Sequence, residues 1–153
     1  MLSNAPLRAR YAVSLLFFLC GVVFTSWASR IPAFKEQFHL NEAELGGVLF
    51  MLPMGSLIAL PFAGWAVDKL GSRIMGSVSI MLYAAALYAL SQSPTVFTLS
   101  IALFIFGFVG NTVNIAVNTQ GLDVQRLTAT VTQLREDLRR LREGAEQGVT
   151  DPA

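Results

Sequence analysis

The sequence is short of charged side chains. Only 14% of its 153 residues are Asp, Glu, Lys or Arg, whereas soluble domains average about 25%. Hydrophobic residues make up 54% of the chain, so its polar side chains cannot cover the surface of a globular domain. The net charge is only +1. These shortages disfavour a soluble enzyme, a disordered chain and a nucleic-acid-binding protein.

Cysteine and histidine are equally scarce, with one of each, Cys20 and His39. A single cysteine cannot form a disulfide within the chain. The two residues stand in different contexts, and no set of metal ligands is evident. The sequence also shows no nucleophile–base pair of the kind an intramembrane enzyme would need. We therefore expect no metal, no other cofactor and no enzymatic activity, and we interpret His39 as an exposed loop residue.

Long runs of uncharged residues dominate the sequence. Four stretches of at least 18 residues contain no charged side chain: Tyr11–Ser29, Leu45–Val67, Ile74–Ser91 and Val96–Leu122. A helix of about 20 apolar residues crosses a hydrocarbon core of about 30 Å. The sequence therefore predicts an all-α integral membrane protein. Its transmembrane domain, residues 1–125, would hold four helices at about residues 11–29, 45–67, 74–91 and 96–118.

The first run also has features of a cleavable signal peptide. Arg8 and Arg10 precede it, and Ser26-Trp27-Ala28 is an acceptable cleavage site. The run is at the long end for a signal peptide, however, and Trp27 suits the aromatic belt at a membrane interface. We favour a transmembrane helix that ends in an interfacial Trp27.

The basic residues are distributed unevenly between the two sides that four crossings define. One side holds nine: Arg8, Arg10, Lys69, Arg73, Arg126, Arg135, Arg139, Arg140 and Arg142. The other side holds only Arg30 and Lys35. Because Lys and Arg accumulate in cytoplasmic loops, this pattern places both termini and the Asp68–Arg73 loop in the cytoplasm. The expected location is a bacterial inner membrane.

Two connections carry local signals. In the external segment Arg30–Leu40, the apolar residues Ile31, Phe34 and Phe38 share one helical face. Asn41 followed by Glu44 fits a capping box, which predicts that the second long helix begins near Glu42. That helix contains Pro53 and Pro61, which can kink it, and Gly64, where a neighbouring helix could approach closely.

The most specific pattern is Gly64-Trp65-Ala66-Val67-Asp68-Lys69-Leu70-Gly71-Ser72-Arg73. Gly71 permits a very tight turn between two helices. Asp68 places a negative charge at the membrane boundary, where it can face a helix amino terminus or an arginine. From the charges alone, a plain turn with basic flanks is an equally good interpretation.

This pattern resembles the signature of the major facilitator superfamily between its second and third helices, Gly-x-x-x-Asp-Arg/Lys-x-Gly-Arg-Arg/Lys. Gly64, Asp68, Lys69, Gly71 and Arg73 match, and Ser72 departs from the usual basic residue. The resemblance implies the first four helices of an amino-terminal half. It also implies that Asp68 ties the two halves of a transporter together while the cytoplasmic gate is shut.

Two further runs are similar to those of bacterial permeases related to fucose and sugar transporters. They are Trp27–Pro32 and Asn114–Gln120, and the likeness covers about residues 10 to 126. The resemblance implies a transmembrane solute transporter whose substrate is a sugar or another small polar solute.

Three carboxamides lie on one face of the fourth predicted helix. Asn111, Asn114 and Asn118 are spaced by three and four residues. Since polar side chains are costly against lipid, this face should meet protein or water. A solute path and a hydrogen-bonded helix contact both fit the pattern, and family resemblance favours the path. No acidic residue lies within the spans, and we interpret Asp123 as a boundary charge.

The sequence changes character after Arg126. Five apolar residues repeat at heptad-like intervals among charged ones: Leu127, Val131, Leu134, Leu138 and Leu141. We expect residues 126–153 to form a short cytoplasmic amphipathic helix with a frayed polar end from Gly144, and this seam allows a homo-oligomer.

Two function classes remain. The first is a transporter present as an incomplete copy, since the superfamily normally has twelve helices and a truncated or rearranged reading frame would explain the change. The second is a small non-transporting membrane protein that oligomerises or binds a partner through its tail.

Overall fold

The computed structural model describes residues 5–149, and the side chains of residues 10–144. This part of the chain consists of five helices without a strand: α1 (Ala5–Ala28), α2 (Ile31–Gln37), α3 (Glu42–Leu70), α4 (Ser72–Ser91) and α5 (Val96–Val149). Four of its helices are long and apolar enough to cross a membrane. The prediction of an all-α protein with four crossing helices is therefore confirmed.

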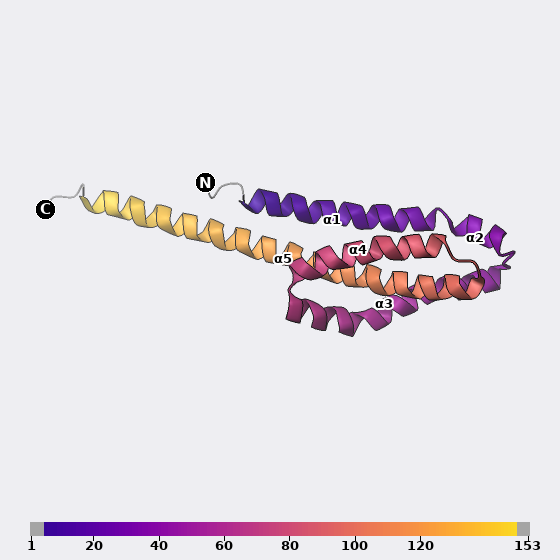
Figure 1. The fold of residues 1–153 in the computed structure, drawn as a ribbon. Helices are drawn as coiled ribbons and strands as arrows, with labels where there is room; N and C mark the ends of the chain where they lie inside the picture. The colour runs from indigo at the N-terminus through magenta and orange to yellow at the C-terminus, as the bar shows by residue number, and fades with distance from the viewer. Residues whose placement is uncertain (1–4, 150–153) are drawn as a thin grey trace.

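The long helices run side by side as a bundle (Figure 1). The short α2 and the connection between α4 and α5 lie at one end of this bundle, and the turn between α3 and α4 lies at the other. The amino end of α1 and the extended part of α5 are found at the same end as that turn. This arrangement agrees with an even number of crossings.

The corner between α2 and α3 follows the predicted local signals. The Asn41 side chain accepts a hydrogen bond from the Glu44 backbone at 2.9 Å, and the Glu44 carboxylate accepts one from the Asn41 backbone at 2.9 Å. The capping box is thus confirmed. His39 lies in the loop just before it, with a positive φ of 52°. The apolar face of the Arg30–Leu40 segment packs onto the bundle core through Ile31, Phe34 and Phe38.

α3 continues through both of its prolines, Pro53 and Pro61, and is curved in Figure 1. A bilayer helix tolerates such missing donors when neighbouring groups satisfy the freed carbonyls. Gly71 alone separates α3 from α4, with a φ of 83°. Because that backbone conformation is costly for any residue with a Cβ, the sequence-based expectation of a tight glycine turn is confirmed.

α5 is the centre of the bundle, since α1, α3 and α4 all pack against it. Its largest fully buried side chains recur at helical spacing: Leu99, Leu103, Phe106, Val113 and Val117. They join Tyr83 and Leu90 of α4 in one apolar core. The membrane half of α5 therefore holds the other three helices in place.

α3 and α5 touch backbone to backbone at two glycines. A Cβ added to Gly55 would lie 2.9 Å from the carbonyl carbon of Phe104, and one added to Gly107 would lie 2.9 Å from that of Leu52. Both distances are shorter than any normal contact of a Cβ atom, so each position requires glycine. The Ser56 hydroxyl reinforces the crossing by donating to the Gly107 carbonyl at 3.1 Å.

α5 also departs from the predicted boundaries. The expected helix end near Asn118 and the expected separate tail helix from residue 126 are not found, because α5 runs unbroken to Val149. The sequence has no proline after Thr119 until residue 152, so nothing interrupts the helical hydrogen bonds. The predicted frayed end is helical over residues 144–149, and residues 150–153 lie outside the described part.

The outer surface of the bundle is apolar. Large side chains such as Phe18, Leu57 and Met81 are 66%, 61% and 74% exposed. A soluble monomer rarely exposes apolar surface on this scale, whereas lipid tails solvate it. Together with the four apolar helices, this surface identifies a multi-pass membrane protein.

Candidate functional site

The three predicted asparagines of α5 have different surroundings. Asn111 is half-buried, and its side-chain amide donates to the Ser56 backbone carbonyl at 2.8 Å. Asn114 and Asn118 are exposed, and neither has a hydrogen-bond partner among the described residues. Asn111 thus holds α5 to α3, whereas the carboxamides of Asn114 and Asn118 remain able to bind something else.

A small cavity of about 160 Å³ opens beside this face. All four long helices contribute to its wall, and one side is aromatic. The residues that line it are Phe24, Leu52, Ser56, Tyr83, Phe106, Gly107, Gly110, Asn111 and Asn114. The structure therefore brings Asn111 and Asn114 together in one cavity, and it leaves Asn118 outside.

The aromatic side of the cavity belongs to a cluster that the sequence did not reveal. The Tyr83 and Phe106 rings stack with centroids 4.4 Å apart, and Trp27 packs on Phe106 at 6.0 Å. Gly110 leaves room for this stack, because a Cβ there would lie 2.8 Å from the Tyr83 ring. Trp27 is only 6% exposed. The interpretation of Trp27 as an interfacial belt residue is therefore wrong, since its ring fills a gap between α1 and α5.

The residues of the predicted signature, Gly64–Arg73, do not form a closed cluster within the described chain. Asp68 and Arg73 are both exposed, and neither makes an ion pair there. The Lys69 ammonium lies 5.2 Å from the centre of the Trp65 ring. Gly64 has open space where a Cβ would be, so no described helix makes the close approach predicted for it. The side of the motif that would meet another helix is unoccupied by this part of the chain.

Ser72, the position that departs from the signature, joins the turn to α5. Its hydroxyl donates to Asp123 at 3.3 Å, and its backbone carbonyl accepts from the Gln120 amide at 2.5 Å. Gly76, one turn further along α4, leaves room for the Gln120 side chain. The expected boundary charge Asp123 therefore helps to fix the turn against α5. A basic side chain at position 72 could pair with Asp123 in the same way.

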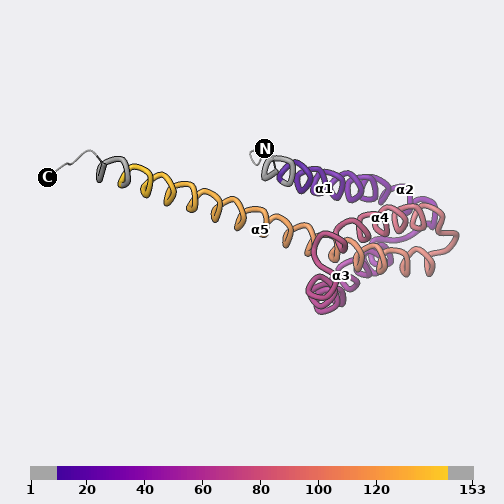
Figure 2. Tube along the Cα trace, turned by 60° about the vertical axis from the view of Figure 1, so that its left-hand side comes forward, coloured from indigo at the N-terminus to yellow at the C-terminus, as the bar shows by residue number. Residues whose placement is uncertain are grey.

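Two other predictions concern metal ligands and the tail of α5. Among the described residues, no group of three or more His, Cys, Asp or Glu side chains could hold a metal ion. The seam of α5 is fully available to solvent, because its five members are between 42% and 70% exposed: Leu127, Val131, Leu134, Leu138 and Leu141. The carboxy-terminal part of α5 extends past the other helices (Figures 1 and 2), and residues 129–144 are all exposed.

Comparison with known proteins gives a family for this arrangement. A family model described as Major Facilitator Superfamily matches residues 2–134. No solved structure matches the chain.

Three curated relatives are similar over most of the chain. An uncharacterized transporter of Sinorhizobium fredii is 34% identical over 110 residues, which are 72% of this chain and 29% of the relative. The membrane protein MosC of Rhizobium meliloti is 32% identical over 71% of this chain and 27% of MosC. An uncharacterized MFS-type transporter of Yersinia pestis is 32% identical over 73% of this chain and 29% of the relative. The chain spans less than a third of the length of these relatives.

Proposed function

The chain belongs to the major facilitator superfamily, and on that premise we propose that it supplies the first four membrane-spanning helices of a solute transporter. The observation that carries the proposal is the cavity beside Asn111 and Asn114. A carboxamide both donates and accepts hydrogen bonds, and the Tyr83–Phe106 stack offers an apolar surface beside it. This combination suits a small polar solute such as a sugar.

The signature residues have a matching role in the proposal. Asp68 and Arg73 are charged, exposed and without an ion-pair partner in the described chain. Gly64 leaves an open surface close by. A second transporter half that closes on this end could form an ion pair with these charges and pack closely against α3 at Gly64. The gating motif Gly64, Asp68, Lys69, Gly71 and Arg73 is therefore proposed to act between halves.

The tail favours a second candidate function. A fully exposed apolar seam on a helix is the usual geometry of a coiled-coil partner surface. In this alternative the chain is a small non-transporting membrane protein that forms a homo-oligomer, or binds a partner, through Leu127, Val131, Leu134, Leu138 and Leu141.

Residues on the proposed solute path should react with water-soluble thiol reagents. We expect Asn114→Cys and Asn118→Cys, each in a Cys20→Ser background, to react at least tenfold faster than Val117→Cys, whose parent side chain is 0% exposed. Asn111→Cys should react at an intermediate rate, because Asn111 is half-buried. The measurement is the rate of modification by a charged methanethiosulfonate in nanodiscs.

A lipid-facing control distinguishes side chains that meet water from side chains that are exposed only to lipid. Ile105 is 48% exposed on another side of α5. Ile105→Cys should react with a lipophilic maleimide but not with the charged reagent. If Asn114→Cys and Asn118→Cys behave like Ile105→Cys, the face meets lipid and the proposed path is wrong.

The proposed orientation, with both termini in the cytoplasm of a bacterial inner membrane, has its own test. Gln37 and Gly144 are exposed at opposite ends of the bundle. In intact cells carrying the Cys20→Ser protein, an impermeant maleimide should label Gln37→Cys within minutes and should label Gly144→Cys only after permeabilisation. Labelling of Gly144→Cys alone would invert the orientation, and labelling of both in intact cells would exclude four crossings.

A further inference from the structure

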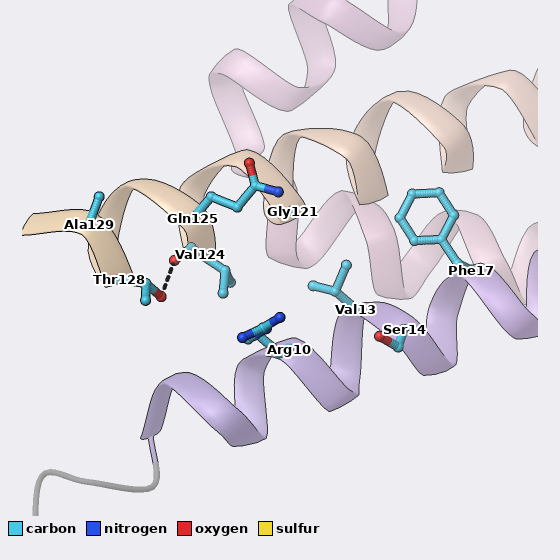
Figure 3. Close-up of a pocket in the computed structure, with 9 residues that line it drawn as sticks. All are labelled: Arg10, Val13, Ser14, Phe17, Gly121, Val124, Gln125, Thr128 and Ala129. Atoms are coloured by element: carbon cyan, nitrogen blue, oxygen red, sulfur yellow. Dashed lines mark hydrogen bonds between the residues drawn. The ribbon is translucent and has the colours of Figure 1, made fainter. Parts of the chain in front are cut away.

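A crevice separates α1 from α5 at the end of the bundle where the α3–α4 turn lies. Its volume is about 560 Å³, which is within the range of small-molecule sites. Figure 3 shows the residues that line it: Arg10, Val13, Ser14 and Phe17 from α1, and Gly121, Val124, Gln125, Thr128 and Ala129 from α5. Arg10 and Asp123 are the charges that bound the two apolar runs, so the crevice lies where the sequence predicts the edge of the membrane.

The α5 side of the crevice continues the asparagine face. Residues separated alternately by four and three positions lie on one side of a helix. Such a series runs along α5 through both hollows: Gly107, Asn111, Asn114, Asn118, Gly121, Gln125 and Thr128. Its first three members line the small cavity, and its last three line the crevice. Asn118 lies between them, so that one polar stripe joins the two hollows.

The α1 side is continuous in the same way. Arg10 and Phe17 line the crevice, and Phe24 lines the small cavity. These residues are seven positions apart, or about two helical turns, so they lie on one face of α1. The crevice and the cavity thus share one face of α1 and one face of α5, and α3 and α4 complete the wall of the cavity.

The crevice carries one charge, and it is positive. Arg10 is exposed, makes no ion pair within the described chain, and extends into the space between the two helices (Figure 3). No acidic side chain lines the crevice. The other polar groups there are neutral: Ser14, Gln125 and Thr128. A single cation between low-dielectric walls raises the local concentration of anions.

We propose that this crevice is the cytoplasmic mouth of the solute path, and that Arg10 makes it selective for anionic solutes, such as sugars or other polyols that carry a carboxylate or a phosphate. Guanidinium groups bind both of these anions through paired hydrogen bonds. The inference rests on the proposed solute path and narrows its substrate class.

The test compares thiol reagents of opposite charge. Gln125→Cys in the Cys20→Ser protein, held in nanodiscs, is treated with a sulfonate-bearing and with a trimethylammonium-bearing methanethiosulfonate. The ratio of the anionic rate to the cationic rate should be severalfold higher at Gln125→Cys than at Gln133→Cys, an exposed tail position. Arg10→Gln should lower this rate ratio about threefold or more, Arg10→Lys should retain it, and high salt should reduce it. Arg135→Gln is the control, because Arg135 is exposed on the tail of α5 and does not line the crevice.

The outcomes distinguish this inference from the proposed path. If Gln125→Cys and Asn118→Cys resist both charged reagents, the path itself is wrong. If both cysteines react but Arg10→Gln leaves the ratio unchanged, the path stands and anion selectivity is wrong. If Gln125→Cys reacts only with a lipophilic maleimide while Asn118→Cys still reacts with the charged reagents, lipid fills the crevice and the inference is overturned.

Discussion

Gly107→Ala should destabilise the helix bundle by about 1–3 kcal/mol, the usual range for an overpacked core position. The added methyl group would lie 2.9 Å from the carbonyl carbon and 3.1 Å from the Cα of Leu52. Because both atoms belong to the backbone of α3, no side chain can rotate to relieve the overlap. α3 would have to move away from α5, and the Ser56 bond to the Gly107 carbonyl would lengthen. Unfolding in mixed micelles of increasing SDS fraction measures this loss.

A glycine on a free face of α3 provides the matched control. An ideal Cβ on Gly47 meets nothing within 4 Å. Gly47→Ala should therefore be neutral or stabilise α3 by up to about 1 kcal/mol, since alanine loses less backbone entropy in a helix than glycine does. Gly55→Ala should resemble Gly107→Ala, because it meets the backbone of Phe104 and Phe108. Equal stability of Gly47→Ala and Gly107→Ala would show that the two helices do not touch at these positions.

The elements that sequence predicted well are those governed by local chemistry. Runs without charge identified the spans because a charge is costly in hydrocarbon wherever it stands. The capping box at Asn41 and the turn at Gly71 depend on a few neighbouring residues. Such features need no knowledge of the partner helix.

The features that sequence did not predict depend on how the helices are paired. Gly55 and Gly107 are ordinary glycines until α3 is placed against α5. Trp27 at the end of an apolar run suggests an interface, and only the position of Phe106 shows that it is buried. Likewise the helical spacing that puts Asn111 and Asn118 on one face gave no indication that only Asn111 would donate to Ser56. The spacing fixed a shared face, whereas the crossing of α3 decided which member was covered.

The end of α5 was misjudged for a different reason. The change from apolar to polar residues after Asn118 marks where a membrane boundary is expected. It carries no signal for the end of a helix, because Gln, Arg, Glu and Leu are all good helix formers. The helix therefore continues through Gly121 into the tail. The membrane boundary itself remains a prediction from the charges of Asp123 and Arg126.

The 153-residue chain, reconstituted alone, should take up no solute. Alternating access in this superfamily requires two halves that rock about a site between them. The described part of the chain supplies only one half of such a site, with a cavity lined by α1, α3, α4 and α5, and Asp68 has no ion-pair partner there. Liposomes containing the chain, offered radiolabelled neutral sugars and sugar phosphates, should show uptake indistinguishable from empty vesicles. Correct insertion is checked in the same liposomes by the labelling of Gln37→Cys and Gly144→Cys.

Asp68→Asn should leave the isolated chain as stable as the parent. Because Asp68 is exposed and makes no ion pair in the described chain, the substitution should change the stability of the isolated chain by less than about 0.5 kcal/mol. A role of Asp68 between two transporter halves predicts this unchanged stability, since the partner charge would lie in the other half. Saturable uptake by the chain alone would contradict the need for a second half. If that uptake were also lost in Leu134→Asp, the exposed seam of the tail would be supplying the second wall through another copy.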